Sequence, residues 1–177
     1  MLRLEHSGDL HLAGIRRRIK ARPMKEIAPL WQQFSVYQGW VPGQIGRTRY
    51  GVSLYVREDA GLFDYLACTQ VATLDGLTSE WNKLTLPAQQ YAVFEHAGHV
   101  SRMRQTVQHI FAAGLSAARL KPARPQLGNV MLIERYGASF NPQTGWGEIQ
   151  VWGPVEKVSQ ATTTSARVRA EETVCNP

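Results

Sequence analysis

The chain has 177 residues, of which 44% are hydrophobic and 19% are charged, and its formal net charge is +6. A chain of this size and composition can bury roughly 70% of its unfolded surface, enough for one or two compact folding units. No apolar run approaches the ~18 residues of a transmembrane helix, and 9 prolines and 15 glycines are too few for a collagen-like or disordered chain. The composition therefore excludes the membrane-spanning, fibrous and disordered classes.

The N-terminus and the cysteines favour a cytoplasmic location. Charged residues and a histidine interrupt residues 1–9, where a signal peptide would have an unbroken apolar stretch. Cys68 and Cys175 are the two cysteines of the chain, too few for a disulfide framework or a four-cysteine metal site.

The positive charge is concentrated in one short cluster, which consists of Arg16, Arg17, Arg18, Lys20, Arg22 and Lys25. Such a cluster raises the question of nucleic acid binding. It has no interleaved aromatic residues and belongs to no DNA-reading motif, which favours a solvated strand and turn over direct DNA binding.

The first half of the chain predicts a strand, a helix and two more strands. Ile27, Leu30, Trp31 and Phe34 form one apolar stripe at helical spacing, which predicts a helix from Lys25 to about Val36. The other expected elements are a strand at residues 11–19, a Gly- and Pro-rich loop at 39–48, and strands at 50–56 and 63–71 around a turn at 58–61.

The second half predicts the same order of elements, about eighty residues later. A strand at residues 90–96 precedes a helix that Ser101 can cap, with an apolar stripe at Met103, Val107, Ile110 and Phe111. A loop at 121–128 and two strands at 130–136 and 148–155 follow. Strand, helix, strand, strand thus occurs twice, at about 10–73 and 88–157.

Two such units can pair through their strands into an α+β structure. We expect one sheet with helices on one face and a concave, unoccupied face on the other, where a ligand would bind. Residues 1–157 would form this domain. Residues 158–177 have no apolar face and predict a disordered tail.

The last predicted strand contains the most informative candidate residues. Side chains alternate along a strand, so Glu148, Gln150 and Trp152 share one face while Ile149 and Val151 share the other. An aromatic plane beside a carboxylate and an amide suits a flat, amphipathic and even cationic ligand. The alternative is an ordinary half-exposed strand, which shows the same alternation.

Three other features of the sequence give weaker evidence for a functional site. Glu134 interrupts an apolar run and could bind a ligand or form a surface ion pair. His96 and His99 fall short of a zinc signature, so we expect no metal. The sequence has no nucleophile elbow, P-loop or dinucleotide fingerprint, and we expect no cofactor.

Residues 91–100, the segment Glu134-Arg135-Tyr136, Asn141-Pro142 and the run Val151–Val155 together resemble the GyrI-like small-molecule-binding family. This family is also the effector-binding domain of some AraC-type and MerR-type transcription regulators. In the first half, Leu12-Ala13-Gly14, Leu30-Trp31 and residues 63–67 look like the opening repeat of the family, so that the resemblance covers about residues 10–157.

The resemblance implies a pseudo-twofold pair of β-α-β-β units with a cleft that accepts amphipathic, often cationic and aromatic compounds. Family members often have a glutamate two places before the aromatic residue of the last strand. In this sequence Gln150 occupies that place. The change removes a negative charge and favours a neutral or zwitterionic ligand.

The leading hypothesis is a small-molecule-binding protein that senses or sequesters its ligand. Trp152 and Tyr91 would stack on the ligand, Glu148, Gln150 and Glu134 would make polar contacts, and Trp40 and Trp146 would lie at the rim. One alternative implied by the family is a hydrolase that opens strained rings of DNA-alkylating compounds, with Glu148 or Glu134 as the base. Another is an interaction protein with a partner such as a topoisomerase. The sequence leaves monomer and dimer open.

Overall fold

The computed structural model describes residues 2–20, 25–56, 61–123 and 129–158. Nearly all of the expected C-terminal tail, most of the turn at 58–61, most of the loop at 121–128 and Arg22 lie outside these residues. Among the described residues no helix is long and apolar enough to cross a membrane.

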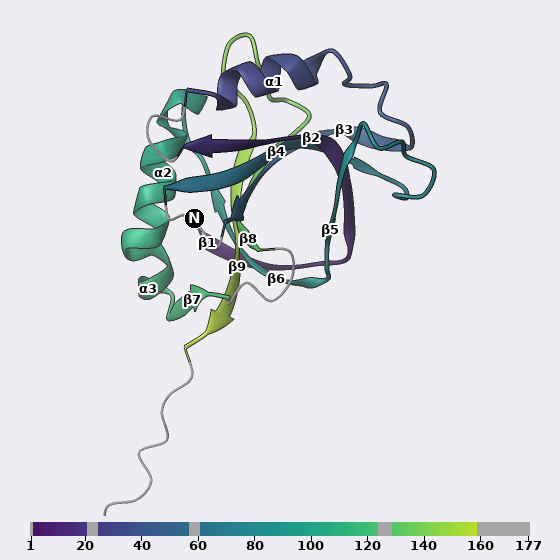
Figure 1. Ribbon diagram of the computed structural model, residues 1–177. Coiled ribbons are helices and arrows are strands. Elements are labelled where there is room, and N and C mark those ends of the chain that lie inside the picture. Colours follow the sequence, from purple (N-terminus) through teal and green to yellow (C-terminus); the bar gives the residue numbers. More distant parts are fainter. Residues whose placement is uncertain (1, 21–24, 57–60, 124–128, 159–177) are drawn as a thin grey trace, which may run out of the picture.

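Two helical segments flank the sheet (Figure 1). The first is α1 (Ile27–Ser35), which buries Leu30 and Phe34, as the apolar stripe predicted. The second begins with a 3₁₀ turn (Val100–Arg102) and continues as α2 (Met103–His109), a π turn (Ile110–Gly114) and α3 (Leu115–Ala117). The backbone amide of Ser101 donates a hydrogen bond to the His99 ring, so His99 rather than the Ser101 side chain caps this segment.

The strands form one antiparallel sheet. Their bounds are β1 (Leu2–Ser7), β2 (Leu10–Lys20), β3 (Gln44–Tyr55), β4 (Leu62–Val71), β5 (Asn82–Leu86), β6 (Gln89–Glu95), β7 (Leu120–Pro122), β8 (Val130–Tyr136) and β9 (Ile149–Lys157). The order across the sheet is β1-β6-β9-β8-β3-β4-β2-β5, and the short strand β7 pairs with β9 beside this path.

The two ends of this order share one register, in a ladder that is interrupted at residues 8–9 and 87–88, and the sheet curls into a half-barrel (Figure 1). β1 runs into β2 and β5 runs into β6, so that Leu2 pairs with Phe94 and Gly14 pairs with Asn82 in the same register. Where the ladder is interrupted, the Asp9 carboxylate accepts a 2.7 Å hydrogen bond from the Ala88 amide.

Each face of the curled sheet has its own apolar core. On the convex face, α1 packs on β2 and β4, and α2 and α3 pack on β6, β8 and β9. Trp31 of α1 contacts both of these clusters. On the concave face a third cluster fills the half-barrel, and its aromatic members are Tyr50, Tyr91 and Trp152.

The expected α+β class and the two helices are confirmed, and the sheet requires corrections. We expected the concave face to be open, whereas Tyr91 is 0% exposed and Trp152 is 8% exposed. The reason is that β1 and β5, which the sequence analysis did not predict, extend the sheet and close it around these side chains. The short strand β7 was also missed, and β3 begins at Gln44, inside the predicted loop.

Candidate functional site

The predicted triplet of the last strand lies on the concave side of the sheet and forms a hydrogen-bonded series. The Trp152 indole N–H donates to the Gln150 amide oxygen at 3.0 Å, and the Gln150 amide donates to Glu148 at 3.3 Å. Arg135 donates to Glu148 at 2.8 Å and to Gln150 at 3.3 Å. The charge of Glu148 is therefore matched within the protein, and Gln150 links the core to this ion pair.

Tyr91 joins Trp152 in the concave core, with ring centroids 5.6 Å apart. Its hydroxyl accepts a 2.8 Å hydrogen bond from Gln89. Since both rings are buried among apolar side chains, neither is free to stack on a ligand in this arrangement.

The two loop tryptophans are exposed and lie in different loops. Trp40 follows α1 and is 82% exposed. Trp146 lies between β8 and β9, is 57% exposed and packs edge-on against His99 with ring centroids 5.7 Å apart. No contact of the described residues brings either ring to Glu148, Gln150 or Trp152.

Glu134 lies on the opposite face of the sheet, under the helices. Its partner in the ladder is Val151, which belongs to the cluster packed under α2. Oε2 of Glu134 accepts hydrogen bonds from the hydroxyls of Tyr65 at 2.5 Å and Tyr136 at 2.9 Å. No basic side chain of the described part of the chain forms an ion pair with it.

Trp31 of α1 completes an aromatic cradle around this carboxylate. Its indole N–H donates to the Tyr65 hydroxyl at 3.1 Å, and its ring packs edge-on against Tyr136 with centroids 5.3 Å apart. Tyr65 comes from β4, Tyr136 and Glu134 from β8, and Trp31 from the helix above. We call Trp31, Tyr65, Glu134 and Tyr136 the cradle.

The surroundings of Glu134 oppose its ionisation. Burial raises the pKa of Glu134 above its usual value of 4.5, and the two tyrosine hydrogen bonds offset only part of this effect. Burial and the neighbouring carboxylate raise the pKa values of Tyr65 and Tyr136 well above 10.0, so both remain hydrogen-bond donors. The carboxylate is still partly accessible to solvent. Such a group is a natural partner for a cation that can leave water at low cost.

The sequence pattern singles out Glu134 but not its tyrosine partners. Tyr65 and Tyr136 are ordinary strand residues by pattern, and Trp31 belongs to the apolar stripe of a helix. One local signal was present for these partners: side chains alternate along a strand, which places Tyr136 on the same face as Glu134. Tyr65 reaches Glu134 because β4 pairs with β3 and β3 pairs with β8, and β8 is far from both of these strands in the sequence.

Two arginines of the basic cluster and His96 are held by contacts within the protein. Asp64, almost buried, pairs with Arg16 at 2.5 Å and with Arg18 at 2.9 Å, and hydrogen bonds from these arginines lower its pKa. His96 is held between Thr106 at 2.8 Å and the His99 carbonyl at 3.0 Å. Within the described ranges, no three His, Cys, Asp or Glu side chains are grouped to hold a metal ion.

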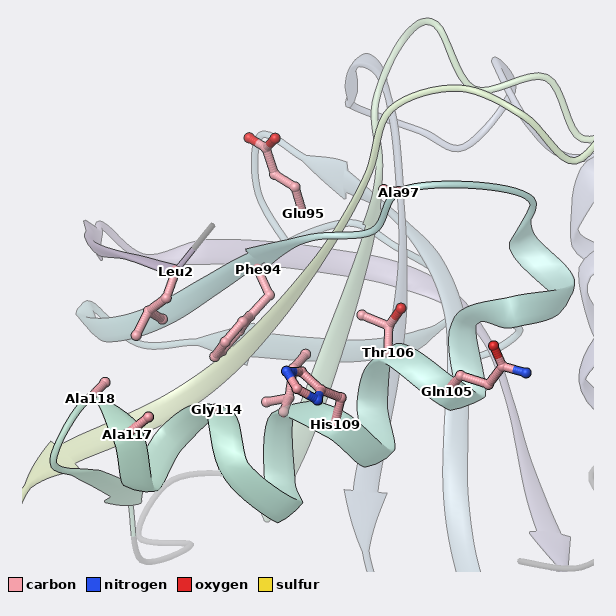
Figure 2. Close-up of a pocket in the computed structure, with 11 residues that line it drawn as sticks. Leu2, Phe94, Glu95, Ala97, Gln105, Thr106, His109, Gly114, Ala117 and Ala118 are labelled. Atoms are coloured by element: carbon pink, nitrogen blue, oxygen red, sulfur yellow. The ribbon is translucent and has the colours of Figure 1, made fainter.

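A groove of about 680 Å³ lies between β6, the edge strand β1 and the α2–α3 segment. Figure 2 shows Leu2 and Phe94 projecting from the strands toward the helical segment. Phe94 pairs with Val151, and Val151 pairs with Glu134, so one strand separates the groove from the cradle. The groove and the cradle are therefore different places.

Residues 3–155 match the model of a protein family described as Cass2, integron-associated effector binding protein. The protein belongs to this family. It is thus an effector-binding protein, and the resemblance noted in the sequence is confirmed. No match was found among curated protein sequences.

Solved structures share the fold. SAV2435 bound to tetraphenylphosphonium is 18% identical with a TM-score of 0.69, covering 88% of this chain and 94% of that protein. An integron cassette protein of Vibrio cholerae is 19% identical with a TM-score of 0.62, covering 88% and 95%. The C-terminal domain of EcmrR is 16% identical with a TM-score of 0.62, covering 89% and 98%. At these identities the likeness establishes the fold.

Proposed function

We propose that this protein binds an amphipathic organic cation with aromatic groups, and that the cradle is the binding site. The observation that carries the proposal is the carboxylate of Glu134, which is desolvated, partly accessible and without a basic partner among the described residues. A bound cation would supply the missing positive charge. The tetraphenylphosphonium complex of SAV2435, which has the same fold, supports this class of ligand.

The chemistry of the cradle favours a lipophilic cation over a small hydrated one. The ring of Trp31, which is only partly buried, attracts cations through its π-electrons and adds apolar contact area, while the buried Tyr65 and Tyr136 hold the carboxylate through their hydroxyls. A delocalised charge surrounded by phenyl groups loses little hydration on entering such a site. A compact ammonium ion would lose much more.

The position of the cradle agrees with two β-α-β-β repeats related by a pseudo-twofold axis. The strand order β6-β9-β8 in one half is followed by the reverse arrangement β3-β4-β2 in the other. Glu134 of β8 pairs with Gly51 of β3, where the two halves meet. The ligand would thus bind between the repeats on the helix-facing side, and not on the concave side where the sequence led us to expect it.

This location changes the meaning of Gln150. Gln150 pairs with Arg135, one residue from Glu134 along β8, so the two side chains point to opposite faces of the sheet. A neutral residue at position 150 therefore does not remove the charge that would hold a cation in the cradle.

The test is titration of the protein with tetraphenylphosphonium, followed by tryptophan fluorescence and calorimetry. We expect Glu134→Gln to weaken binding at least tenfold, in line with about 1.5–3 kcal/mol for a hydrogen bond to a charged group. Glu148→Gln is the matched control, because Glu148 lies on the other face and is paired with Arg135. Triphenylphosphine oxide, a neutral probe of similar shape, should bind both proteins alike. Equal loss in the two variants would refute the proposed site.

A further inference from the structure

Arg49 is a second charged residue beside the cradle. It lies on β3 and pairs with Tyr136, so its side chain shares the helix-facing side with Tyr136 and Glu134. It is partly buried. No hydrogen bond or ion pair engages its guanidinium within the described residues.

The unpaired state of Arg49 contrasts with other arginines on the sheet. Arg16 and Arg18 share Asp64, and Arg135 is paired with Glu148. Arg49 is desolvated by its surroundings, and the nearby charge of Arg47 adds repulsion, both of which lower its pKa. A partly buried guanidinium without an acceptor is costly, and a bound anion would relieve this cost.

The register places Arg49 and Glu134 as diagonal neighbours across β3 and β8. Arg49 is opposite Tyr136, and Glu134 is two residues before Tyr136. Diagonal neighbours of this kind have Cα atoms about 7–8 Å apart. Two unpaired charges of opposite sign thus flank one tyrosine, close enough for both to reach one small molecule.

We propose that Arg49 binds an anionic group of the ligand, so that the preferred ligand is an aromatic zwitterion. This inference rests on the proposed function, because Glu134 must hold the cationic part. The anionic part would be a carboxylate or a group of similar geometry, which can accept two parallel hydrogen bonds from the guanidinium. The two ligand charges would be separated by about one aromatic ring.

The proposal predicts opposite effects on two matched probes. A rhodamine with a free benzoate is a zwitterion, and its methyl ester is the corresponding cation. The wild-type protein should bind the benzoate about tenfold more tightly than the ester, by fluorescence anisotropy. Arg49→Gln should weaken the benzoate about tenfold and leave the ester unchanged or bound more tightly, because the substitution also removes repulsion of the cation.

Arg47→Gln is the control, since Arg47 is an exposed neighbour on the same strand and the substitution removes the same charge. It should leave the preference intact. Arg49→Lys keeps the charge without the planar pair of donors, and should retain part of the preference if Arg49→Gln proves unstable in a thermal melt.

Each negative result of this experiment identifies which of the two proposals is wrong. If the ester binds and Glu134→Gln weakens it, but the benzoate gains nothing over the ester, the zwitterion inference is wrong and the proposed function stands. A preference lost equally in Arg47→Gln and Arg49→Gln would likewise overturn a direct contact. If neither probe responds to Glu134→Gln, the cradle itself is refuted.

Discussion

Tyr65 on β4 donates a 2.5 Å hydrogen bond to Glu134 on β8, although β3 lies between these two strands. The bond passes over Gly51, which pairs with Glu134 on one side and with Ala67 on the other. A Cβ atom at Gly51 would overlap the Tyr65 hydroxyl and would lie 2.8 Å from Oε2 of Glu134. The absence of a side chain at Gly51 is therefore what lets the phenol and the carboxylate meet above the middle of the sheet.

Gly51→Ala should consequently damage both the fold and the site. The methyl group would displace a fully buried tyrosine, and overpacking of this kind costs about 1–3 kcal/mol. Urea unfolding would measure the loss, and titration with tetraphenylphosphonium should show weaker binding in the folded protein.

Gly153→Ala is the matched control, because Gly153 also lies in a strand and a Cβ there would meet no atom within 4 Å. Its free energy of unfolding should stay within about 0.5 kcal/mol of wild type, with unchanged binding. A Gly51→Ala protein as stable as Gly153→Ala would show that Tyr65 can move without consequence.

Glu134→Gln should make the protein more stable at neutral pH while removing cation binding. The pKa of Glu134 is raised in the folded state, so between the unfolded and folded pKa values the folded protein binds more protons than the unfolded chain. The free energy of unfolding therefore falls as the pH rises through this range. Glutamine removes this loss and can still accept hydrogen bonds from the tyrosines.

Thermal melts of wild type and Glu134→Gln as a function of pH would measure the effect. The two curves should converge below the unfolded pKa of a glutamate and separate above the folded pKa, with the variant melting higher. For a chain of this size, each kcal/mol corresponds to roughly 2–4 °C. A wild-type protein that is the more stable of the two at neutral pH would contradict a desolvated carboxylate.

The affinity for tetraphenylphosphonium should decrease at acid pH. Ionised Glu134 strengthens the binding of the cation, so below the pKa of this group the affinity should fall with decreasing pH until it reaches that of Glu134→Gln. Because this pKa is raised, the decrease should begin at a higher pH than for an ordinary glutamate. Tyr65 and Tyr136 stay protonated and Arg49 stays charged over this range, so among these neighbours Glu134 alone titrates. Calorimetry at several pH values would test this, and a flat profile would exclude Glu134 as the partner of the cation.

Local patterns predicted the central elements of this fold, because their periodicity is strong. The stripe of α1 and the alternating strands of both halves depend on residues close in sequence. β1 and β5 were missed because polar residues interrupt both, and because they are stabilised by pairing with distant strands rather than by their own composition. Their absence from the prediction led to an open concave face.

The candidate site could be predicted only in part for the same reason. Alternation correctly separated Gln150 and Trp152 from Ile149 and Val151. It could not show which of the two faces carries an unpaired charge, because that depends on which strands adjoin β8 and β9. Arg135 neutralises Glu148 on one face, while Tyr65 and Tyr136 accommodate Glu134 on the other.

Trp152→Ala should reduce stability much more than ligand binding. The sequence led us to expect the opposite, but Trp152 is 8% exposed and packs on Tyr91 and Ile133 in the concave core. Loss of a buried tryptophan side chain costs about 3–5 kcal/mol. Trp152→Phe keeps most of the packing and loses the hydrogen bond to Gln150, so a smaller loss of about 0.5–1.5 kcal/mol is expected.

Urea unfolding of both variants, with tetraphenylphosphonium titrations of the folded proteins, separates the role of Trp152 in stability from a role in ligand binding. Trp40→Ala, at an 82% exposed position, should leave stability unchanged within about 0.5 kcal/mol. If Trp152→Phe retained full stability but lost the cation, the ligand would bind on the concave side and the cradle would not be its site.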